Sequence, residues 1–323
     1  MSSTFETIKA YLNYLDQQII GQSTLTQRLF TALLADGHLL VEGAPGLAKT
    51  TAIKALSDGL EGDFHRVQFT PDLLPADLTG TEIYRPQDGS FVFQQGPLFH
   101  NLLLADEINR APAKVQSALL EAMGEHQITV GRTTYKLPEL FLVMATQNPI
   151  EQEGTYPLPE AQLDRFLLHV NITYPDIESE KKILHLVRNR DMKQPLESVE
   201  KPEKVTQEML FEARDAVLNL HMSDAIEEYI VQLIAATRNP GAYGDDLASW
   251  VMYGASPRGT IALDRCARAV AWLAGRDYVA PEDVQEIIGD VLRHRVLLSF
   301  EAEAEGVTPD KFIEELVNRV PVP

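Results

Sequence analysis

The chain has 323 residues, enough for one large domain or two, and its 45% content of hydrophobic residues can bury a core. A formal net charge of −19 argues against generic attraction to nucleic acid, although net charge does not exclude a local basic patch. The apolar runs are shorter than the roughly 20 residues of a membrane-spanning helix, and the first residues lack the pattern of a secretory signal. Cys266 is the only cysteine, which excludes an internal disulfide and favours the cytoplasm.

The first half of the chain alternates between helical and strand-like patterns. Residues 4–35 carry apolar side chains at helical spacing and predict two helices, separated at Gly21–Gln22. Further along, a helix is expected over residues 49–60. Strands are expected at four short apolar runs, Leu39–Val41, Val67–Phe69, Leu102–Ala105 and Phe141–Ala145. Continuous apolar runs are typical of strands buried on both faces, and helices between them favour a parallel sheet. We therefore predict an α/β fold.

Two hairpins interrupt this alternation. In the first, Ile83–Gln94, the turn signal Asp88–Gly89 separates two segments rich in aromatic and β-branched residues. In the second, Gln127–Leu137, Gly131–Arg132 takes the same place. Surface decoration is the simplest explanation for both.

After Pro175 the pattern becomes helical. Asp176 is expected to cap a helix that runs to about Val187, and the charged residues 188–204 predict a loop. Ser256 followed by Pro257 is typical of a helix start within the helical region that follows. We expect four parts: N-terminal helices at 1–36, an α/β domain at 37–178, a helix end and linker at 179–205, and a helical domain at 206–323.

The segment after the first predicted strand is typical of a phosphate-binding loop. Its residues are Gly43, Ala44, Pro45, Gly46, Leu47, Ala48, Lys49, Thr50 and Thr51. Glycines let backbone N–H groups approach phosphate oxygens, Lys49 is suited to the β- and γ-phosphates, and Thr50 is suited to Mg²⁺. Ala48 replaces the usual second glycine and is expected to hold a backbone angle that its Cβ tolerates. An ordinary Gly/Pro turn before a helix is the alternative.

Polar residues follow two of the other predicted strands. Asp106 and Glu107 end one strand, where ligands of open α/β sheets bind. Asp106 is suited to hold hydrated Mg²⁺, and Glu107 to polarise the water that attacks the γ-phosphate. Asn148 follows the next strand and is either a γ-phosphate or water ligand, or simply part of an Asn–Pro turn.

Taken together, these motifs resemble those of AAA+ ATPases, and more narrowly those of the MoxR family. The resemblance covers roughly residues 15–300. It is carried by Gly43–Thr50, Gln68–Gly80, Gly96–Phe99, Leu103–Arg110, Ala111–Met123, Ala145–Pro149 and Leu158–Phe166. It implies an AAA+ P-loop core with a parallel sheet, followed by a small all-helical lid domain, and Ala before the loop lysine is habitual in this family.

The resemblance also implies roles for single residues. Asn148 matches the sensor-1 position, and Arg258 matches sensor 2, a cation near the γ-phosphate. Without a phosphate, Arg258 in the first turn of a helix would oppose the helix dipole. Arg165 matches the arginine finger that reaches a neighbouring subunit's nucleotide, although a local pair with Asp164 or Glu160 is the alternative. Arg110 is a second candidate for the contact in trans.

Other segments gain a meaning from the same resemblance. Ile20 and Gly21 match the motif near the adenine base, although a plain helix–helix turn is the alternative. Residues 72–98 match the helix-2 insert and residues 126–137 the hairpin before sensor 1, both of which project toward the pore or the client in related rings. The aromatic residues of this region either contact a client or pack the insert onto the domain. They are Tyr84, Phe91, Phe93 and Phe99.

The function implied by the resemblance is that of an ATPase that uses ATP and Mg²⁺ and forms a ring, expected to be a hexamer. Such a chaperone-like protein would remodel others for maturation, complex assembly or metal and cofactor insertion, with a von Willebrand factor A domain protein as partner. Neither nucleic acid nor membrane insertion is expected, and the scattered histidines predict no zinc or iron site. The alternatives are a nucleic-acid motor and an ATP-dependent scaffold with little turnover.

Overall fold

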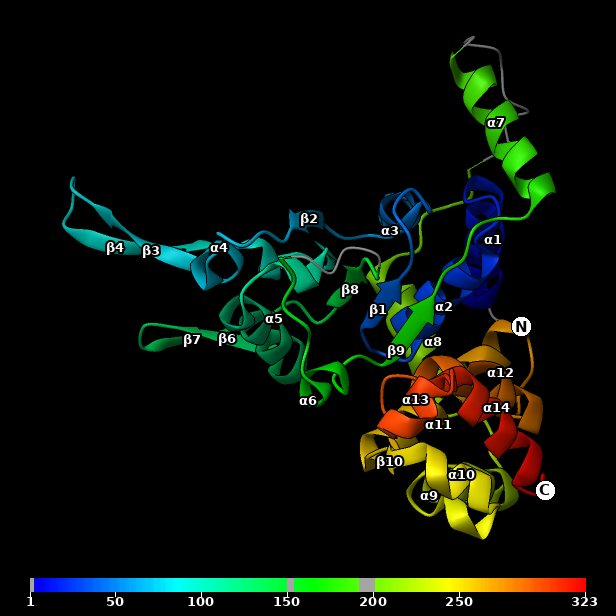
Figure 1. Cartoon of the computed structure of the whole chain (residues 1–323). Helices are drawn as coiled ribbons and strands as arrows, with labels where there is room; N and C mark the ends of the chain where they lie inside the picture. The colour runs from blue at the N-terminus through cyan, green and yellow to red at the C-terminus, as the bar shows by residue number, and fades with distance from the viewer. Residues whose placement is uncertain (1–2, 150–153, 192–200) are drawn as a thin grey trace. The chain divides into compact units, whose positions relative to one another are not determined.

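The structure is a computed structural model, and it describes residues 3–149, 154–191 and 201–323 (Figure 1). The chain divides into two compact units. The first unit comprises Met1–Phe30, His38–Leu158 and Val170–Phe211, and the second comprises Thr31–Gly37, Pro159–His169 and Glu212–Pro323. Neither unit is continuous in sequence, because residues 31–37 and 159–169 belong with the C-terminal helices. The domain limits expected from the sequence remain predictions.

A five-stranded sheet has the order β2-β5-β8-β1-β9. The strands are β1 (Leu39–Glu42), β2 (Phe64–Gln68), β5 (Leu102–Asp106), β8 (Leu142–Gln147) and β9 (Leu168–Asn171). The neighbours β2–β5, β5–β8 and β1–β8 pair in parallel, and Leu102–Ala105 are fully buried. The predicted parallel α/β sheet is confirmed. However, β2 begins at Phe64 rather than Val67, and β9 was not predicted, since its sequence Leu-His-Val-Asn is not a continuous apolar run.

Helices precede, separate and follow these strands along the chain. They are α1 (Ser3–Gln18), α2 (Ser23–Leu34), α3 (Lys49–Asp58), α4 (Pro75–Thr79), α5 (Ala113–Glu125) and α7 (Ile177–Asp191), with short 3₁₀ turns at Pro97–Phe99 and Ile108–Arg110. The carboxylate of Asp176 accepts a hydrogen bond from the Ser179 N–H (2.7 Å), which confirms the predicted cap of α7. The helix continues to Asp191 rather than Val187, so the loop predicted over 188–204 begins too early. Residues 192–200 of that loop lie outside the described residues.

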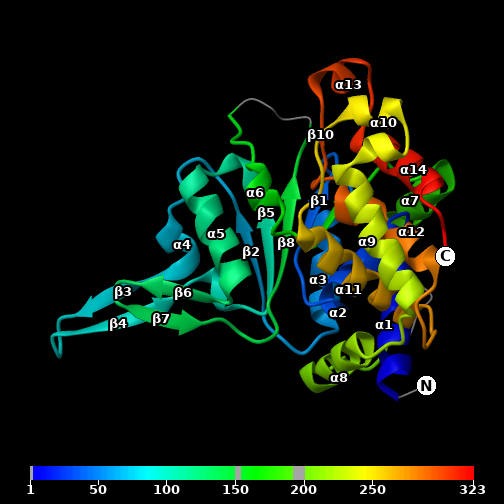
Figure 2. The same ribbon diagram turned by 90° about the horizontal axis from the view of Figure 1, so that it is seen from below.

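Both predicted hairpins are present, and they lie against each other (Figure 2). They consist of β3 (Gly80–Arg85) with β4 (Ser90–Gln95), and β6 (Gln127–Val130) with β7 (Thr133–Lys136). Phe93 stacks on Tyr135 of the second hairpin (centroids 4.1 Å apart) and meets Phe99 edge-on. Tyr84 and Phe91, in contrast, pair with each other and are 53% and 66% exposed. Phe93 and Phe99 therefore pack the hairpins, whereas Tyr84 and Phe91 face solvent.

The second unit is mostly helical (Figure 1). Its elements are α6 (Glu160–Leu163), α9 (Asp224–Arg238), α10 (Asp245–Trp250), α11 (Pro257–Leu273), α12 (Pro281–Leu292), α13 (Phe300–Ala304) and α14 (Pro309–Arg319), while α8 (Gln207–Leu218) is divided between the units. Two short antiparallel strands, β10 (Val251–Tyr253) and β11 (Leu297–Leu298), also occur here, so the lid predicted as all-helical contains a small two-stranded sheet. None of the described helices combines the length and the apolar character needed to cross a bilayer.

Candidate functional site

The loop between β1 and α3 is built on left-handed backbone. Gly46 has φ = 84°, and Ala48, directly before the helix, has φ = 58° and ψ = 17°. For an alanine this conformation costs about 1 kcal/mol, because the Cβ approaches the carbonyl oxygen that follows. Ala48 therefore takes the conformation that the usual glycine would take, and its Cβ tolerates it only at a cost.

Gly43 closes the start of the loop. A Cβ at this position would lie 2.4 Å from the Ile172 side chain and 2.8 Å from the Ile172 carbonyl oxygen, so only glycine fits. The Gly43 carbonyl accepts a hydrogen bond from the Lys49 ammonium (2.7 Å). Burial lowers the pKa of Lys49, while the carboxylates of Asp106, Glu107 and Glu42 act in the opposite direction. The lysine is thus held across the loop and faces acidic groups.

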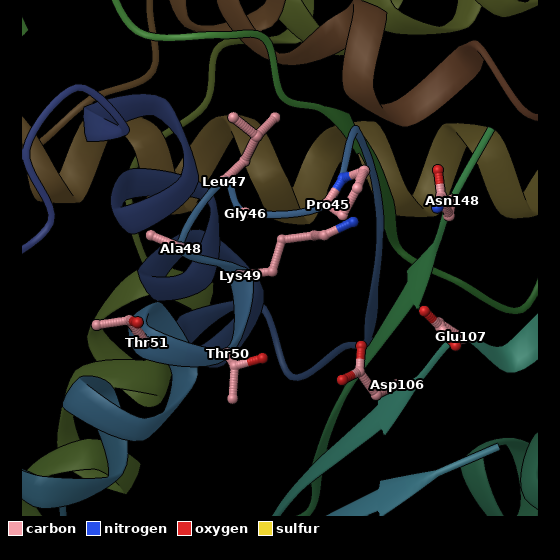
Figure 3. A pocket seen from close by; sticks show the side chains of 10 residues that line it. All are labelled: Pro45, Gly46, Leu47, Ala48, Lys49, Thr50, Thr51, Asp106, Glu107 and Asn148. Carbon is pink, nitrogen blue, oxygen red and sulfur yellow. The ribbon is translucent and has the colours of Figure 1, made fainter. Parts of the chain in front are cut away.

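The loop and the ends of two strands line a cavity of about 330 Å³ (Figure 3). In the picture Lys49 and Thr50 lie on one side, and Asp106, Glu107 and Asn148 on the other. The lining residues are Pro45, Gly46, Leu47, Ala48, Lys49, Thr50, Thr51, Asp106, Glu107 and Asn148. Three separate segments of the first unit therefore bring a cation, a hydroxyl, two carboxylates and an amide to one cavity.

A hydroxyl from β8 holds the acidic side of the cavity. Thr146 donates a hydrogen bond to Asp106 Oδ1 (2.6 Å), and its oxygen accepts one from the Glu107 N–H (2.9 Å). Glu107 itself has φ = 56° and ψ = 52°, a left-handed conformation that is uncommon for a glutamate. Backbone strain of this kind concentrates at functional sites.

Two side chains of β2 that were not predicted as site residues complete this network. Arg66 forms an ion pair with Asp106 Oδ2 (2.6 Å), and the Gln68 amide donates to Glu107 Oε2 (2.7 Å). Arg110 also contacts Glu107 of its own chain (3.1 Å). A sequence signal existed, because Arg66 and Gln68 are polar residues at a spacing of two around a buried valine, but their partners depend on the register of β2 against β5.

The donor set of the cavity fits a nucleotide with Mg²⁺. The Thr50 hydroxyl and the Asp106 carboxylate supply hard oxygen ligands, which Mg²⁺ prefers, and substrate phosphates normally supply others. Loop backbone at the start of α3 suits phosphate oxygens, because the N-terminus of a helix carries a partial positive charge. Thr50 and Asp106 would hold the ion there.

Other predicted residues lie outside this cavity. Gly21 has φ = 79°, and a Cβ there would approach Pro175 to 2.7 Å, so Ile20 and Gly21 sit at a tight turn between α1 and α2. They are not among the residues that line the cavity, so their role at the base remains a prediction. The predicted roles of Arg165 and Arg258, which belong to the second unit, also remain predictions.

Several hydrogen bonds within the second unit surround Arg258. Ser256 caps α11 by accepting from the Arg258 N–H (3.2 Å), as the sequence predicted. The Ser256 hydroxyl also donates to Asp164 Oδ2 (3.0 Å), while the Arg258 guanidinium lies 4.0 Å from the same oxygen. Gly254 is required just before this turn, because a Cβ there would lie 2.4 Å from the Thr237 carbonyl oxygen. The start of α11 is thereby tied to the residue next to Arg165.

Comparisons with known proteins agree with this architecture. Residues 38–168 match the family described as ATPase family associated with various cellular activities (AAA), and residues 248–316 match the AAA lid domain. Chaperone MoxR1 of Mycobacterium tuberculosis is 44% identical over 100% of this chain and 84% of its own length. Protein MoxR of Methylorubrum extorquens is 34% identical over 94% of this chain and 92% of its own.

A solved structure is also similar. The crystal structure of a candidate ATPase from Cytophaga hutchinsonii superposes with a TM-score of 0.89 at 46% identity, covering 99% of this chain and 96% of that one. The chain belongs to the MoxR family of AAA+ ATPases.

Proposed function

We propose that this chain binds ATP with Mg²⁺ in the cavity between the β1–α3 loop and the ends of β5 and β8, hydrolyses it, and uses the cycle to remodel partner proteins. One observation carries the proposal. Lys49 and Thr50 from the loop and Asp106 and Glu107 from the end of β5 line the same cavity, with Asn148 beside them. Three segments distant in sequence supply the parts that phosphoryl transfer requires.

Each residue would have a distinct role in hydrolysis. Lys49 would bind the β- and γ-phosphates, and Thr50 and Asp106 would hold the ion, directly or through water. When bound, Mg²⁺ supplies positive charge that neutralises the phosphates. Glu107 would orient and polarise the attacking water, for which it must first leave Gln68 and Arg110. Asn148, which is almost fully buried, would fix the water or the γ-phosphate.

Assembly would complete the site. We propose that Arg258 of the lid approaches the γ-phosphate of its own subunit, that Arg165 reaches a neighbour's nucleotide, and that Ile20 and Gly21 flank the base. This arrangement requires head-to-tail contacts between subunits, and we propose that these contacts close into a hexameric ring. We also propose that the protein is cytoplasmic. A protein client, reached through a partner with a von Willebrand factor A domain, is proposed by analogy with the family. The exposed pair Tyr84 and Phe91 on the β3–β4 hairpin supports a protein contact at that site.

A variant that separates binding from hydrolysis tests this function. We expect Glu107→Gln to bind ATP with Mg²⁺ by calorimetry but to lose phosphate release by about 10²-fold or more, because an amide cannot accept the proton of the attacking water. Glu125→Gln, which makes the same change at an exposed position on α5, should behave as wild type.

Two outcomes would contradict the proposal. Wild-type protein that takes up no ATP in the presence of Mg²⁺ would remove the nucleotide site altogether. Wild-type protein that binds ATP tightly, assembles, and releases no phosphate even with partner proteins present would instead favour the ATP-dependent scaffold.

A further inference from the structure

Arg66 engages the carboxylate that the proposed function assigns to Mg²⁺. Its Nη2 and Nε atoms lie 2.6 and 3.1 Å from Asp106 Oδ2. The other oxygen of the same carboxylate, Oδ1, accepts the Thr146 hydroxyl at 2.6 Å. Both oxygens of Asp106 therefore already have a donor, and one of these donors is a full positive charge.

The two donors differ in how easily they can leave. Thr146 is 1% exposed on β8, in the middle of the sheet, and also accepts from the Glu107 backbone. The Arg66 side chain, by contrast, is 49% exposed and lies on β2, at the edge of the sheet. Solvent can therefore take up the guanidinium when it moves, whereas the Thr146 hydroxyl is fixed by its strand. Arg66 is the partner of Asp106 that can be exchanged.

The ion pair is also connected to the second carboxylate. Arg66 Nη2 donates to the side-chain oxygen of Gln68 (3.1 Å), and the Gln68 amide donates to Glu107 (2.7 Å). This chain of hydrogen bonds means that Arg66 orients Gln68 while Gln68 holds Glu107. Movement of Arg66 would therefore change the hydrogen bonding of both Asp106 and Glu107.

A guanidinium at Asp106 and a divalent cation beside the same carboxylate repel each other. We propose that Arg66 neutralises Asp106 in the nucleotide-free site, that Mg²⁺ bound with the nucleotide displaces it, and that Arg66 thereby sets the Mg²⁺ concentration at which nucleotide binds. Arg66 is a positioning residue in this scheme, since it acts through Asp106. The inference rests on the proposed function, in which Asp106 holds the ion.

Nucleotide binding measured against Mg²⁺ concentration tests this role. The probe is an N-methylanthraniloyl derivative of the non-hydrolysable analogue AMP-PNP, titrated into the full-length protein by fluorescence. Arg66→Gln should lower the half-saturating Mg²⁺ concentration by about fivefold, roughly 1 kcal/mol, the upper end for a half-exposed ion pair. Arg66→Lys, which keeps the charge without the two-pronged contact, should fall between Arg66→Gln and wild type.

The same variant should have the opposite effect when Mg²⁺ is removed. In EDTA, Arg66→Gln leaves the Asp106 charge uncompensated near the phosphates, so affinity for the analogue should decrease. A variant damaged in folding would lose affinity in both conditions, and only the proposed role predicts opposite signs. Arg132→Gln, which removes one positive charge from the exposed β6–β7 turn, should leave both affinities as in wild type.

Several results would overturn the inference. If the half-saturating Mg²⁺ concentration of Arg66→Gln is equal to or higher than that of wild type, the inference is contradicted. The proposed function is not contradicted by that result, provided that wild type binds the analogue with Mg²⁺. Equal effects of Arg66→Gln in the wild-type and Asp106→Asn backgrounds would also contradict it, because the role requires the carboxylate. Wild-type protein without any Mg²⁺-dependent binding would overturn the inference and the proposed function together.

Discussion

Two residues of the cavity hold a backbone conformation that their side chains disfavour. Ala48 precedes α3 with φ = 58°, and Glu107 follows β5 with φ = 56°. In each case the neighbouring residue carries a proposed role: Lys49 directly follows Ala48, and Asp106 directly precedes Glu107. Backbone strain of this kind clusters at functional sites. The strained positions therefore lie directly beside charged groups that line the cavity.

Lys49 offers the most direct test at the scale of a single residue. It is the one lysine that lines the cavity within the described part of the chain, and it faces both Asp106 and Glu107. Lys49→Ala should weaken nucleotide binding by about tenfold to a hundredfold, since a charge-assisted hydrogen bond contributes roughly 1.5–3 kcal/mol. Lys54→Ala, an exposed lysine of the same helix α3, is the matched control for calorimetry. Equal affinities of the two variants would exclude Lys49 from phosphate binding.

At the scale of elements, the segment directly after α12 is hydrogen-bonded to the segment that contains Arg165. Arg295, which is nearly buried, donates to Asp164 Oδ1 (2.9 Å) and to the carbonyl oxygens of Phe166 (2.6 Å) and Leu167 (3.2 Å). His294 contacts the Phe166 carbonyl as well, through Nε2 at 3.1 Å. These contacts give hydrogen-bond donors to the backbone carbonyl groups of Phe166 and Leu167. The segment that contains the proposed arginine finger is thus tied to the residues directly after α12 by several hydrogen bonds.

Because of His294, the stability of the folded protein should depend on pH. Burial, with Arg295, His169 and Arg293 nearby, holds the pKa of His294 well below its ordinary value. The folded protein keeps this side chain neutral, whereas the unfolded chain takes up a proton below about pH 6.5. Unfolding then binds a proton, so the stability contributed at neutral pH should be lost as the pH falls below 6.5, by up to roughly 1.4 kcal/mol per pH unit.

Urea unfolding at pH 7.5, 6.0 and 5.0 measures this effect. His294→Gln keeps a donor for the Phe166 carbonyl and does not titrate, so its free energy of unfolding should decrease less than that of wild type between pH 6.5 and 5. The other histidines are the same in both proteins, so the comparison isolates the change at position 294. A difference between the two proteins that stays constant with pH would show that His294 does not carry the effect.

At the scale of the whole molecule, the sequence predicts those elements whose signal lies in a local pattern of residues. The apolar runs at Leu102–Ala105 and Leu39–Val41 predict buried parallel strands, and the Gly-rich turn before Lys49 predicts the loop, because each signal lies within a few adjacent residues. The pairing of Arg66 with Asp106 could not be predicted. It depends on strand order and register, which bring β2 beside β5 although they are far apart in sequence.

Which distant segments share a compact unit could not be predicted from the local sequence pattern either. Residues 31–36 fall within the predicted N-terminal helices and residues 159–169 within the predicted α/β domain, yet both segments belong to the unit of the C-terminal helices. The contacts responsible, such as Arg295 with Asp164, join residues that are 131 positions apart. The four aromatic residues of the insert make the same point. The sequence leaves their role open, and only the packing separates Phe93 and Phe99 from the exposed Tyr84 and Phe91.

Assembly into a ring leads to a prediction that can be tested only by mixing different subunits. If Arg165 acts on a neighbour's nucleotide, Arg165→Ala should bind ATP but lose turnover by about 10³-fold or more, as expected for an arginine finger. Glu107→Gln should be inactive for a different reason, since its own site lacks the base while its finger is intact. An equimolar mixture then contains interfaces where an intact Glu107 meets an intact Arg165. Random assembly makes these about a quarter of all interfaces in a ring of head-to-tail contacts.

We therefore expect the mixture to regain a measurable fraction of wild-type phosphate release, whereas each variant alone remains inactive. Mixing wild type with Glu107→Gln provides the control, because it shows how far one inactive site suppresses its neighbours in the same ring. If wild type tolerates such neighbours and the two variants still fail to complement each other, Arg165 does not act across the interface. The local pair with Asp164 or Glu160 would then be the better assignment, and Arg110 would become the arginine to test in the same mixture.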